Sequence, residues 1–272
     1  MPWQRLTPRT EHLPPEVVDR VRLTVSCGDC DELPKVPEAG QVVVRDGTPV
    51  QVMHNGVVVE AGGYFGDWMA EIIRCLGGHH EPQEERAFAA VLARLRDEPR
   101  PVTAVELGSF WAYYSLWFLA ERPDGHVVAL EPDPANLELG RRNFELNGRS
   151  GTFVHGVLGP EPGAVRPFEN LDGSSTDVRE LDLPTLLAET GVDRVDLLLC
   201  DVQGGEHHLL GPAAELVAAG RIRFAVVSTH HHSISGDPLT HQRVLEQVRE
   251  LGGTVVVEHA VGESCSGDGL VV

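Results

Sequence analysis

The chain has 272 residues, which is long enough for one large α/β domain with an appendage. Its formal net charge of −19 argues against nucleic acid or an anionic membrane as a partner, because both require a basic surface. No apolar run approaches the roughly 18 residues of a membrane span, and the N-terminus lacks the apolar core of a signal peptide. The composition therefore predicts a cytoplasmic protein without membrane or nucleic-acid partners.

Residues 1–80 are predicted to form a small N-terminal α+β extension. Residues 1–40 show little periodicity and are expected to wrap over the surface. Three short β-like runs and a helix follow, and the first two runs are joined by the hairpin dipeptide Asp46-Gly47. They are expected at Gln41–Val44, Val50–Met53, Val57–Glu60 and Asp67–Cys75.

Aromatic residues at the end of this extension, Tyr64, Phe65 and Trp68, are expected to cover a site of this chain or, in a homo-oligomer, of a neighbour. The five cysteines, an odd number, fit a reducing compartment. Cys27 and Cys30 have the spacing of a zinc knuckle, but no second pair of this spacing follows. Two ordinary thiols are the favoured interpretation, and a structural zinc is the alternative.

Residues 81–272 are predicted to form the main domain, because strands and helices alternate there as in a parallel sheet. The last two strands are expected to pair as a hairpin with an antiparallel final strand. Strands are predicted at Val102–Leu107, His126–Leu130, Thr152–His155, Val195–Cys200, Phe224–Ser228, Thr254–Glu258 and Gly269–Val272. Helices are predicted from Pro82 to Arg96, over the aromatic run after Ala112, from Asp133-Pro134 to Asn147, over Asp182–Thr190, and from Asp237-Pro238 to Gly252.

The first two strands of this domain each stop at or beside an acid, Glu106 and Glu131, which are 25 positions apart. Ligands of open α/β sheets lie at these strand ends, and the second acid commonly binds a ribose diol. Phe110 and Ala112 stand where a dinucleotide fingerprint needs glycine. We therefore expect a nucleoside cofactor without phosphates, S-adenosylmethionine.

Within that site, Glu131 is expected to accept hydrogen bonds from the ribose hydroxyls, with Pro132 beside it. Gly108 would let the backbone approach the methionine part, and Ser109 would offer a small polar contact. Glu106 would orient the loop or face the ammonium group. The alternative is a plain α/β unit whose acids cap helices.

The loop after the apolar central strand places Asp201 and Glu206 beside the expected cofactor. Two carboxylates there would bind a hard divalent cation such as Mg²⁺, although Glu206 would also favour a helix N-terminus through the helix dipole. Asp201 is predicted to act in catalysis and to contact the cofactor.

The fifth strand ends at His230, His231 and His232, which cannot all point one way because side chains alternate along a strand. A neutral His230 would take the proton of an attacking hydroxyl or complete a metal site with Asp201 and Glu206. His241, on the next helix, is expected at the surface.

A further polar cluster precedes the helix that feeds the first strand of the domain. His79, His80 and Glu81 are candidates for substrate contact. Glu84 and Glu85 are explained equally well by helix capping.

Four segments of the chain resemble the FkbM-type methyltransferases, over roughly residues 80–272. Glu106-Leu107-Gly108 followed by Ser115 is similar to the family's first motif, D/E-x-G-x-x-x-G-x-x-S, with Ala112 in place of the last glycine and the bulky Trp111 beside it. Residues 196–206 closely resemble its signature D-L-L-x-x-D-V-Q-G-x-E. Residues 227–230 and 267–271 are similar to its I-G-T-H segment and its closing strand.

The resemblance implies a class I methyltransferase fold and an S-adenosylmethionine-dependent O-methyltransferase acting on a sugar or another hydroxyl of a secondary metabolite. A divalent cation or His230 would help to deprotonate that hydroxyl. Three alternatives stay open. They are methyl transfer to nitrogen or carbon without metal, a protein that binds cofactor but serves as an assembly partner, and a nicotinamide dehydrogenase.

Overall fold

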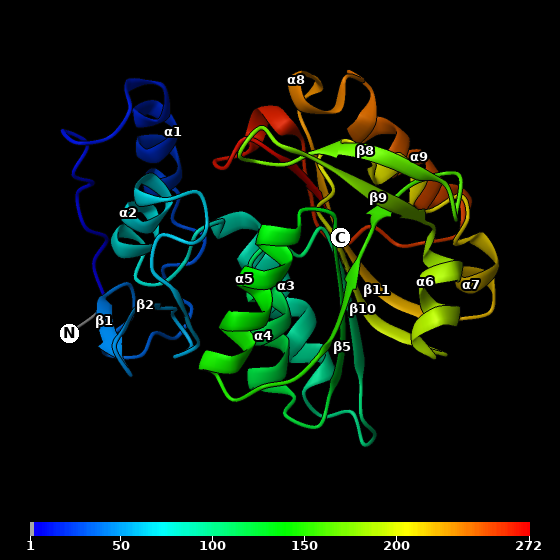
Figure 1. Ribbon diagram of the computed structural model, residues 1–272, viewed down its shortest axis with the longest axis horizontal. Coiled ribbons are helices and arrows are strands. Elements are labelled where there is room, and N and C mark those ends of the chain that lie inside the picture. Colours follow the sequence, from blue (N-terminus) through cyan, green and yellow to red (C-terminus); the bar gives the residue numbers. More distant parts are fainter. Residues whose placement is uncertain (1–2) are drawn as a thin grey trace.

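A seven-stranded, mostly parallel sheet forms the centre of the molecule, in the order β12–β13–β11–β10–β4–β5–β6 (Figure 1). The computed structural model describes residues 3–272. The final strand, β13, lies antiparallel to both of its neighbours, and the other pairs are parallel. The sheet consists of β4 (Thr103–Leu107), β5 (His126–Glu131), β6 (Thr152–His155), β10 (Val195–Cys200), β11 (Ile222–Thr229), β12 (Glu258–His259) and β13 (Gly269–Val271). The predicted fold class, with its terminal antiparallel hairpin, is confirmed.

Helices cover both faces of this sheet (Figure 1). One face carries α3 (Pro82–Leu95), α4 (Tyr113–Glu121) and α5 (Pro134–Leu146). The other carries α6 (Leu183–Thr190), α7 (Ala214–Ala218) and α9 (Thr240–Glu250). Two large apolar clusters fill the spaces between sheet and helices, one on each side. This explains why β10, the central strand, is buried at every position and has no polar alternation.

The N-terminal part packs beside α3, α4 and α5 and contains its own three-stranded sheet. Its elements are α1 (Pro15–Ser26), β1 (Val42–Arg45), β2 (Thr48–Val52), β3 (Val58–Glu60) and α2 (Asp67–Cys75). The expectation of a surface wrap over residues 1–40 is corrected by α1, whose Val21 and Val25 are buried. The first two residues of the predicted extension lie outside the described residues. The boundary proposed at residue 80 falls between α2 and α3.

A third sheet, of β7 (Val157–Leu158), β8 (Val165–Glu169) and β9 (Ser175–Leu181), covers the carboxyl ends of the central strands. No strand was predicted for this segment. Four of the five residues of β8 are exposed, so the strand shows no alternation of apolar and polar positions.

The boundary of α9 differs from the prediction of a helix starting at Asp237-Pro238. A short helix, α8 (His232–Ser235), comes first, and α9 begins at Thr240. The Asp237 carboxylate accepts a hydrogen bond from the backbone N–H of Leu239 (2.9 Å), which forms a turn before the helix. Two 3₁₀ turns, Glu206–His208 and Val261–Glu263, complete the described secondary structure.

Candidate cofactor and catalytic site

A cavity of about 550 Å³ opens at the carboxyl ends of β4, β5 and β10. The structure brings together there all of the side chains and backbone positions predicted to contact the cofactor. They are Glu106, Gly108, Ser109, Glu131, Pro132 and Asp201. Strand pairing accounts for this, because β4 lies between β5 and β10 in the sheet and their parallel ends meet at one edge.

At Gly108, the end of β4 lies very close to the loop that follows β10. Its φ is +78°, and a Cβ atom at this position would lie 1.8 Å from the carbonyl oxygen of Asp201. The predicted reason for this glycine was approach of the cofactor, and the structure adds close approach of the β10 loop. Ala112 also has a left-handed backbone, with φ at +56°, where the family motif has glycine.

Glu131, at the end of β5, faces the cavity and fixes the neighbouring loop. Its carboxylate accepts hydrogen bonds from the backbone N–H groups of Phe110 (2.9 Å) and Asp133 (3.1 Å). Burial raises the pKa of Glu131 to about 7, against the lowering effect of these hydrogen bonds. The Asn136 side chain also donates to the oxygen that accepts from Asp133 (3.4 Å). The other oxygen accepts only from Phe110, so it keeps a lone pair for a ligand hydroxyl.

Glu106 holds the start of α4. Its carboxylate accepts hydrogen bonds from the backbone N–H of Ser115 (3.2 Å) and from the Ser115 hydroxyl. Burial raises the pKa of Glu106 to about 8. Ser109 lies next to it, and its hydroxyl is buried without a hydrogen-bond partner among the residues that the structure describes. Of the two roles predicted for Glu106, the orienting role is the one that these contacts support.

Aromatic side chains of the N-terminal part form one wall of the cavity. Tyr64 stacks on Trp111, with ring centroids 4.4 Å apart and planes 5° apart, and both side chains line the cavity together with Phe65. The extension therefore covers a site of its own chain. Residues from the β8–β9 segment, Phe168 and Leu171, line the cavity as well and were missed because that hairpin has no sequence signal.

His230 lies behind Asp201, and three carboxylates surround it. Its Nε2 is 3.2 Å from an Asp201 oxygen and 3.7 Å from an Asp268 oxygen, and its Nδ1 is 2.6 Å from a Glu206 oxygen. Burial acts to lower the pKa of His230, but these acids outweigh it and raise the pKa to about 11. The imidazole is therefore a cation at neutral pH, whereas the predicted base is a neutral imidazole.

The three predicted metal ligands, Asp201, Glu206 and His230, do not surround one common point. Glu206 binds one ring nitrogen of His230 and Asp201 faces the other, so a single ion cannot replace both contacts. Asp201 lines the cavity, while Glu206 is fully buried. Of the three adjacent histidines, His231 and His232 are exposed. His230 is thus the one that faces the site.

Two further buried acids precede or begin α3. Glu81 lines the cavity, 3.5 Å from the Tyr114 hydroxyl. Glu84 accepts a hydrogen bond from the Ser228 hydroxyl and is close enough to Glu81 and Asp201 for their charges to interact. Burial raises the pKa of Glu84 to about 8, and burial also raises the pKa of Glu81. Glu84 caps no helix, in contrast to Glu85, whose carboxylate accepts from the backbone N–H groups of His80 and Glu81.

The surface position predicted for His241 is wrong. The side chain is buried, its Nδ1 lies 2.7 Å from the Thr229 hydroxyl, and its Nε2 lies 3.2 Å from a Glu258 oxygen. Asp268, which approaches His230, is a site residue that the sequence analysis did not single out. Its position directly before the final strand, next to β11, was the available signal.

Residues 98–253 match the model of the methyltransferase FkbM domain. The human protein named "Transmembrane O-methyltransferase" is 28% identical over 144 residues, and the protein of that name from Pan troglodytes matches equally well. The match covers 49% of this chain and 43% of those relatives, so the chain spans less than half of their length. Among the described residues, no helix is both long and apolar enough to cross a membrane.

Solved structures with a similar fold include a precorrin-6y C5,15-methyltransferase from Geobacter metallireducens. It is 16% identical, with a TM-score of 0.42, over 63% of this chain and 72% of that one. A putative O-methyltransferase from Klebsiella pneumoniae is 19% identical, with a TM-score of 0.42, over 68% of this chain and 76% of that one.

Proposed function

Because the chain belongs to the FkbM methyltransferase family, we propose that this S-adenosylmethionine-dependent methyltransferase acts on a hydroxyl group of a small molecule, a sugar or a secondary metabolite. The named activity of the matched relatives supports oxygen as the acceptor. The acidic surroundings of the cavity support a small, uncharged or cationic substrate. The absence of nucleic-acid and membrane partners, the cytoplasmic location and a homo-oligomer stay predictions from the sequence.

The residues of the cavity fit this cofactor. Glu131 presents an acceptor to a ribose hydroxyl, the buried Ser109 hydroxyl has a hydrogen bond still to make, and Tyr64 and Trp111 supply apolar surface. The Asp201 carboxylate lines the cavity, where it would stabilise a sulfonium or ammonium group, and Glu106 would add a second negative charge on losing its proton. When bound, the cofactor supplies an electrophilic methyl group, and the protein is left with alignment and removal of the acceptor's proton.

The observation that carries the proposal is the position of Asp201, the one member of the Asp201–His230–Glu206 chain that reaches the cavity. We expect Asp201 to accept the hydroxyl proton of the substrate. His230, as a cation held by Glu206 and Asp268, orients the Asp201 carboxylate through the contact with its Nε2. His230 is therefore a positioning residue rather than the base that the sequence suggested.

A divalent cation is the second way to activate the hydroxyl. Asp201 and Asp268 both approach Nε2 of His230, so a cation at this place would have to displace the proton shared there. The close ion pairs of His230 therefore favour direct transfer of the proton from the substrate hydroxyl to Asp201, without a cation.

The test starts with calorimetric titration of S-adenosylmethionine and continues with a methylation screen of sugars and polyhydroxylated metabolites. Reactions are run with Mg²⁺ and with a chelator, and products are located by NMR. We expect binding and transfer to oxygen. For Asp201→Asn we expect a loss of about 10²-fold or more in kcat, measured at saturating cofactor because the lost charge also weakens cofactor binding. Gln203→Ala, a change at another cavity-lining position, is the matched control.

Other outcomes would overturn particular parts. Methyl transfer to nitrogen or carbon contradicts the acceptor, and binding without turnover on any acceptor class supports an assembly partner. Full activity of Asp201→Asn contradicts the proposed base. A loss of turnover with chelator that Mg²⁺ restores would favour the cation.

A further inference from the structure

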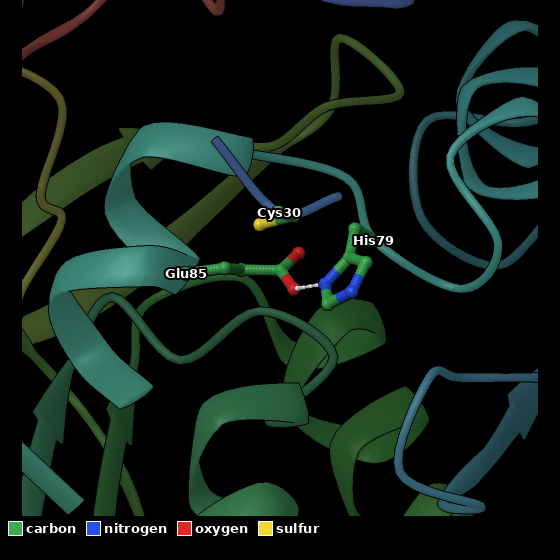
Figure 2. A group of neighbouring side chains, drawn as sticks. All are labelled: Cys30, His79 and Glu85. Carbon is green, nitrogen blue, oxygen red and sulfur yellow. Dashed lines mark hydrogen bonds and ion pairs between the residues drawn. The ribbon is translucent and has the colours of Figure 1, made fainter. Parts of the chain in front are cut away.

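Three metal-binding side chains meet outside the cofactor cavity: Cys30, His79 and Glu85 (Figure 2). Cys30 follows α1, His79 lies in the loop between α2 and α3, and Glu85 is in the first turns of α3. One donor atom from each lies within 4.8 Å of the others. The cluster therefore joins three segments that are separate in the sequence.

All three side chains are buried. Cys30 is 3% exposed, and His79 and Glu85 are fully buried. The Glu85 carboxylate binds Nδ1 of His79 and lies 2.6 Å from Nδ1 of His80. The Glu85 carboxylate is therefore held against the His79 ring, and both lie close to the Cys30 thiol, so three different metal-binding donors share one buried place.

Several buried polar atoms around the cluster lack a hydrogen-bond partner among the described residues. Nε2 of His79 and Nε2 of His54 are buried without a hydrogen-bond partner among the described residues, and the His54 and His79 rings stack at 4.1 Å. The Tyr113 hydroxyl, close enough to Glu85 and Cys30 for their charges to affect it, is likewise unpartnered. Such orphaned groups are rare in native interiors, so the core around the cluster is unusually polar. The His79 nitrogen that faces the cluster is Nδ1 (Figure 2).

We propose that Cys30, His79 and Glu85 bind one Zn²⁺ ion. A sulfur, a nitrogen and a carboxylate oxygen form a donor set that suits zinc, whereas Mg²⁺ and Ca²⁺ take oxygen donors. On binding, the ion displaces the proton of the Cys30 thiol, which otherwise donates to the backbone carbonyl of Pro82 (3.0 Å). The proton shared by His79 and Glu85 leaves as well.

This site differs from the knuckle considered for Cys27 and Cys30. Cys27 is not part of the cluster, and its thiol contacts that of Cys265. Cys30 alone takes part in the cluster. A protein with the Cys27 thiol removed should therefore still bind zinc.

The position of the site gives the ion a structural role. It would tie the segment after α1 to the start of α3, and the residues that follow His79 directly, His80 and Glu81, line the cofactor cavity. Zinc would thus fix one wall of that cavity without touching its contents. The inference does not depend on which acceptor the enzyme methylates.

The test measures metal in the full-length protein, purified without chelator, by mass spectrometry of the elements. We expect about one zinc per chain, at least a tenfold loss in Cys30→Ser and Glu85→Gln, and full retention in Cys27→Ser, the matched control. Circular dichroism reports whether each variant is folded. Zinc-free preparations, or equal zinc in wild type and in folded Cys30→Ser, overturn the proposal, and so does loss of zinc in a folded Cys27→Ser.

A second measurement decides the case in which the variants do not fold. Wild-type protein is depleted of zinc and titrated with Co²⁺, which reports its ligands by absorption. A sulfur-to-cobalt charge-transfer band supports the site, because Cys30 would be the thiolate. The same band must persist in Cys27→Ser. Its absence from wild type overturns the proposal.

Discussion

Single residues determine the conformation of the loop between β4 and α4, which borders the cavity. Gly108 was predicted to be a point of close approach, and the structure shows that what approaches is the Asp201 carbonyl. Glu106, Glu131 and Asp201 were identified because an acid at the end of an apolar strand is a local pattern. His230 was also found, but its charge state was not, because that depends on Asp268 and Glu206, which are distant in sequence.

Gly108→Ala should unfold far more easily than a matched variant, Gly62→Ala. Both glycines have a positive φ, +78° and +73°, so each substitution costs about 1 kcal/mol in backbone strain. A Cβ at Gly62 meets open space, whereas a Cβ at Gly108 collides with backbone. We expect a further loss of about 3 kcal/mol at Gly108, measured by urea unfolding. Equal losses of unfolding free energy in the two variants would show that the loop after β10 shifts to make room for the new Cβ.

His230 should stay protonated through neutral pH. Its pKa of about 11 means that the imidazole proton signals hold their cationic shifts between about pH 6 and pH 9 in an NMR titration. Asp268→Asn should lower the midpoint, because it removes one of the surrounding carboxylates. Titration of His230 near its ordinary pKa in the wild type would contradict this arrangement and restore it as a candidate base.

Pairs of elements decide how the N-terminal part is attached. Two asparagine side chains, one in α5 and one directly after it, bind the backbone of β3 in place of another strand. Asn147 accepts from the N–H of Val58 (3.0 Å) and donates to its carbonyl (2.6 Å), and Asn143 accepts from the N–H of Glu60 (2.8 Å). The edge of the small sheet is covered in this way, which protects it from pairing with other chains.

Asn147→Ala should destabilise the protein by about 2–3 kcal/mol, because it leaves a buried N–H and a buried carbonyl of Val58 without partners. Glu145→Ala, an exposed change on the same helix, should stay within about 0.5 kcal/mol. Both values come from urea denaturation. If the two variants are equally stable, the asparagine does not hold the extension.

The elements also show where periodicity fails as a guide. α2 was predicted with its observed bounds and β4, β5 and β10 to within a residue, because burial on one or both faces leaves a clear apolar pattern. α1 and the β8–β9 hairpin were missed because they are mostly exposed. The β8–β9 hairpin supplies part of the cavity wall, so that part of the site was not visible in the sequence.

Several buried carboxyl groups lie in and near the cofactor cavity. Burial raises the pKa of Glu84 and Glu106 to about 8 and that of Glu131 to about 7. In the unfolded chain these groups lose their protons near pH 4.5, so between there and about pH 8 the folded state binds more protons. His230 acts in the same direction between about pH 6.5 and 11. Stability without cofactor should therefore fall as pH rises from 6 to 8.5, as checked by thermal unfolding.

Cofactor affinity should change in the opposite direction. A cationic cofactor favours ionised Glu106 and Glu131, so binding releases protons. Between pH 6 and 8 the affinity should rise by up to about tenfold per pH unit for each proton released. Calorimetry in buffers of different ionisation enthalpy counts those protons. Glu106→Gln, which keeps an acceptor for Ser115, should reduce the pH dependence. Binding that is independent of pH would contradict the role of these acids.

The sequence by itself determined the fold class, the family and the strand ends that form the cofactor site, because each is written in contiguous residues: apolar strands, a glycine turn and acids next to them. Tertiary structure alone decided what those residues do together. It made His230 a cation between three carboxylates, turned the extension onto the cavity of its own chain, and separated Cys30 from Cys27 to meet His79 and Glu85. Charge state and ligand geometry depend on groups that only folding brings within a few ångströms, since electrostatic coupling and burial act through space.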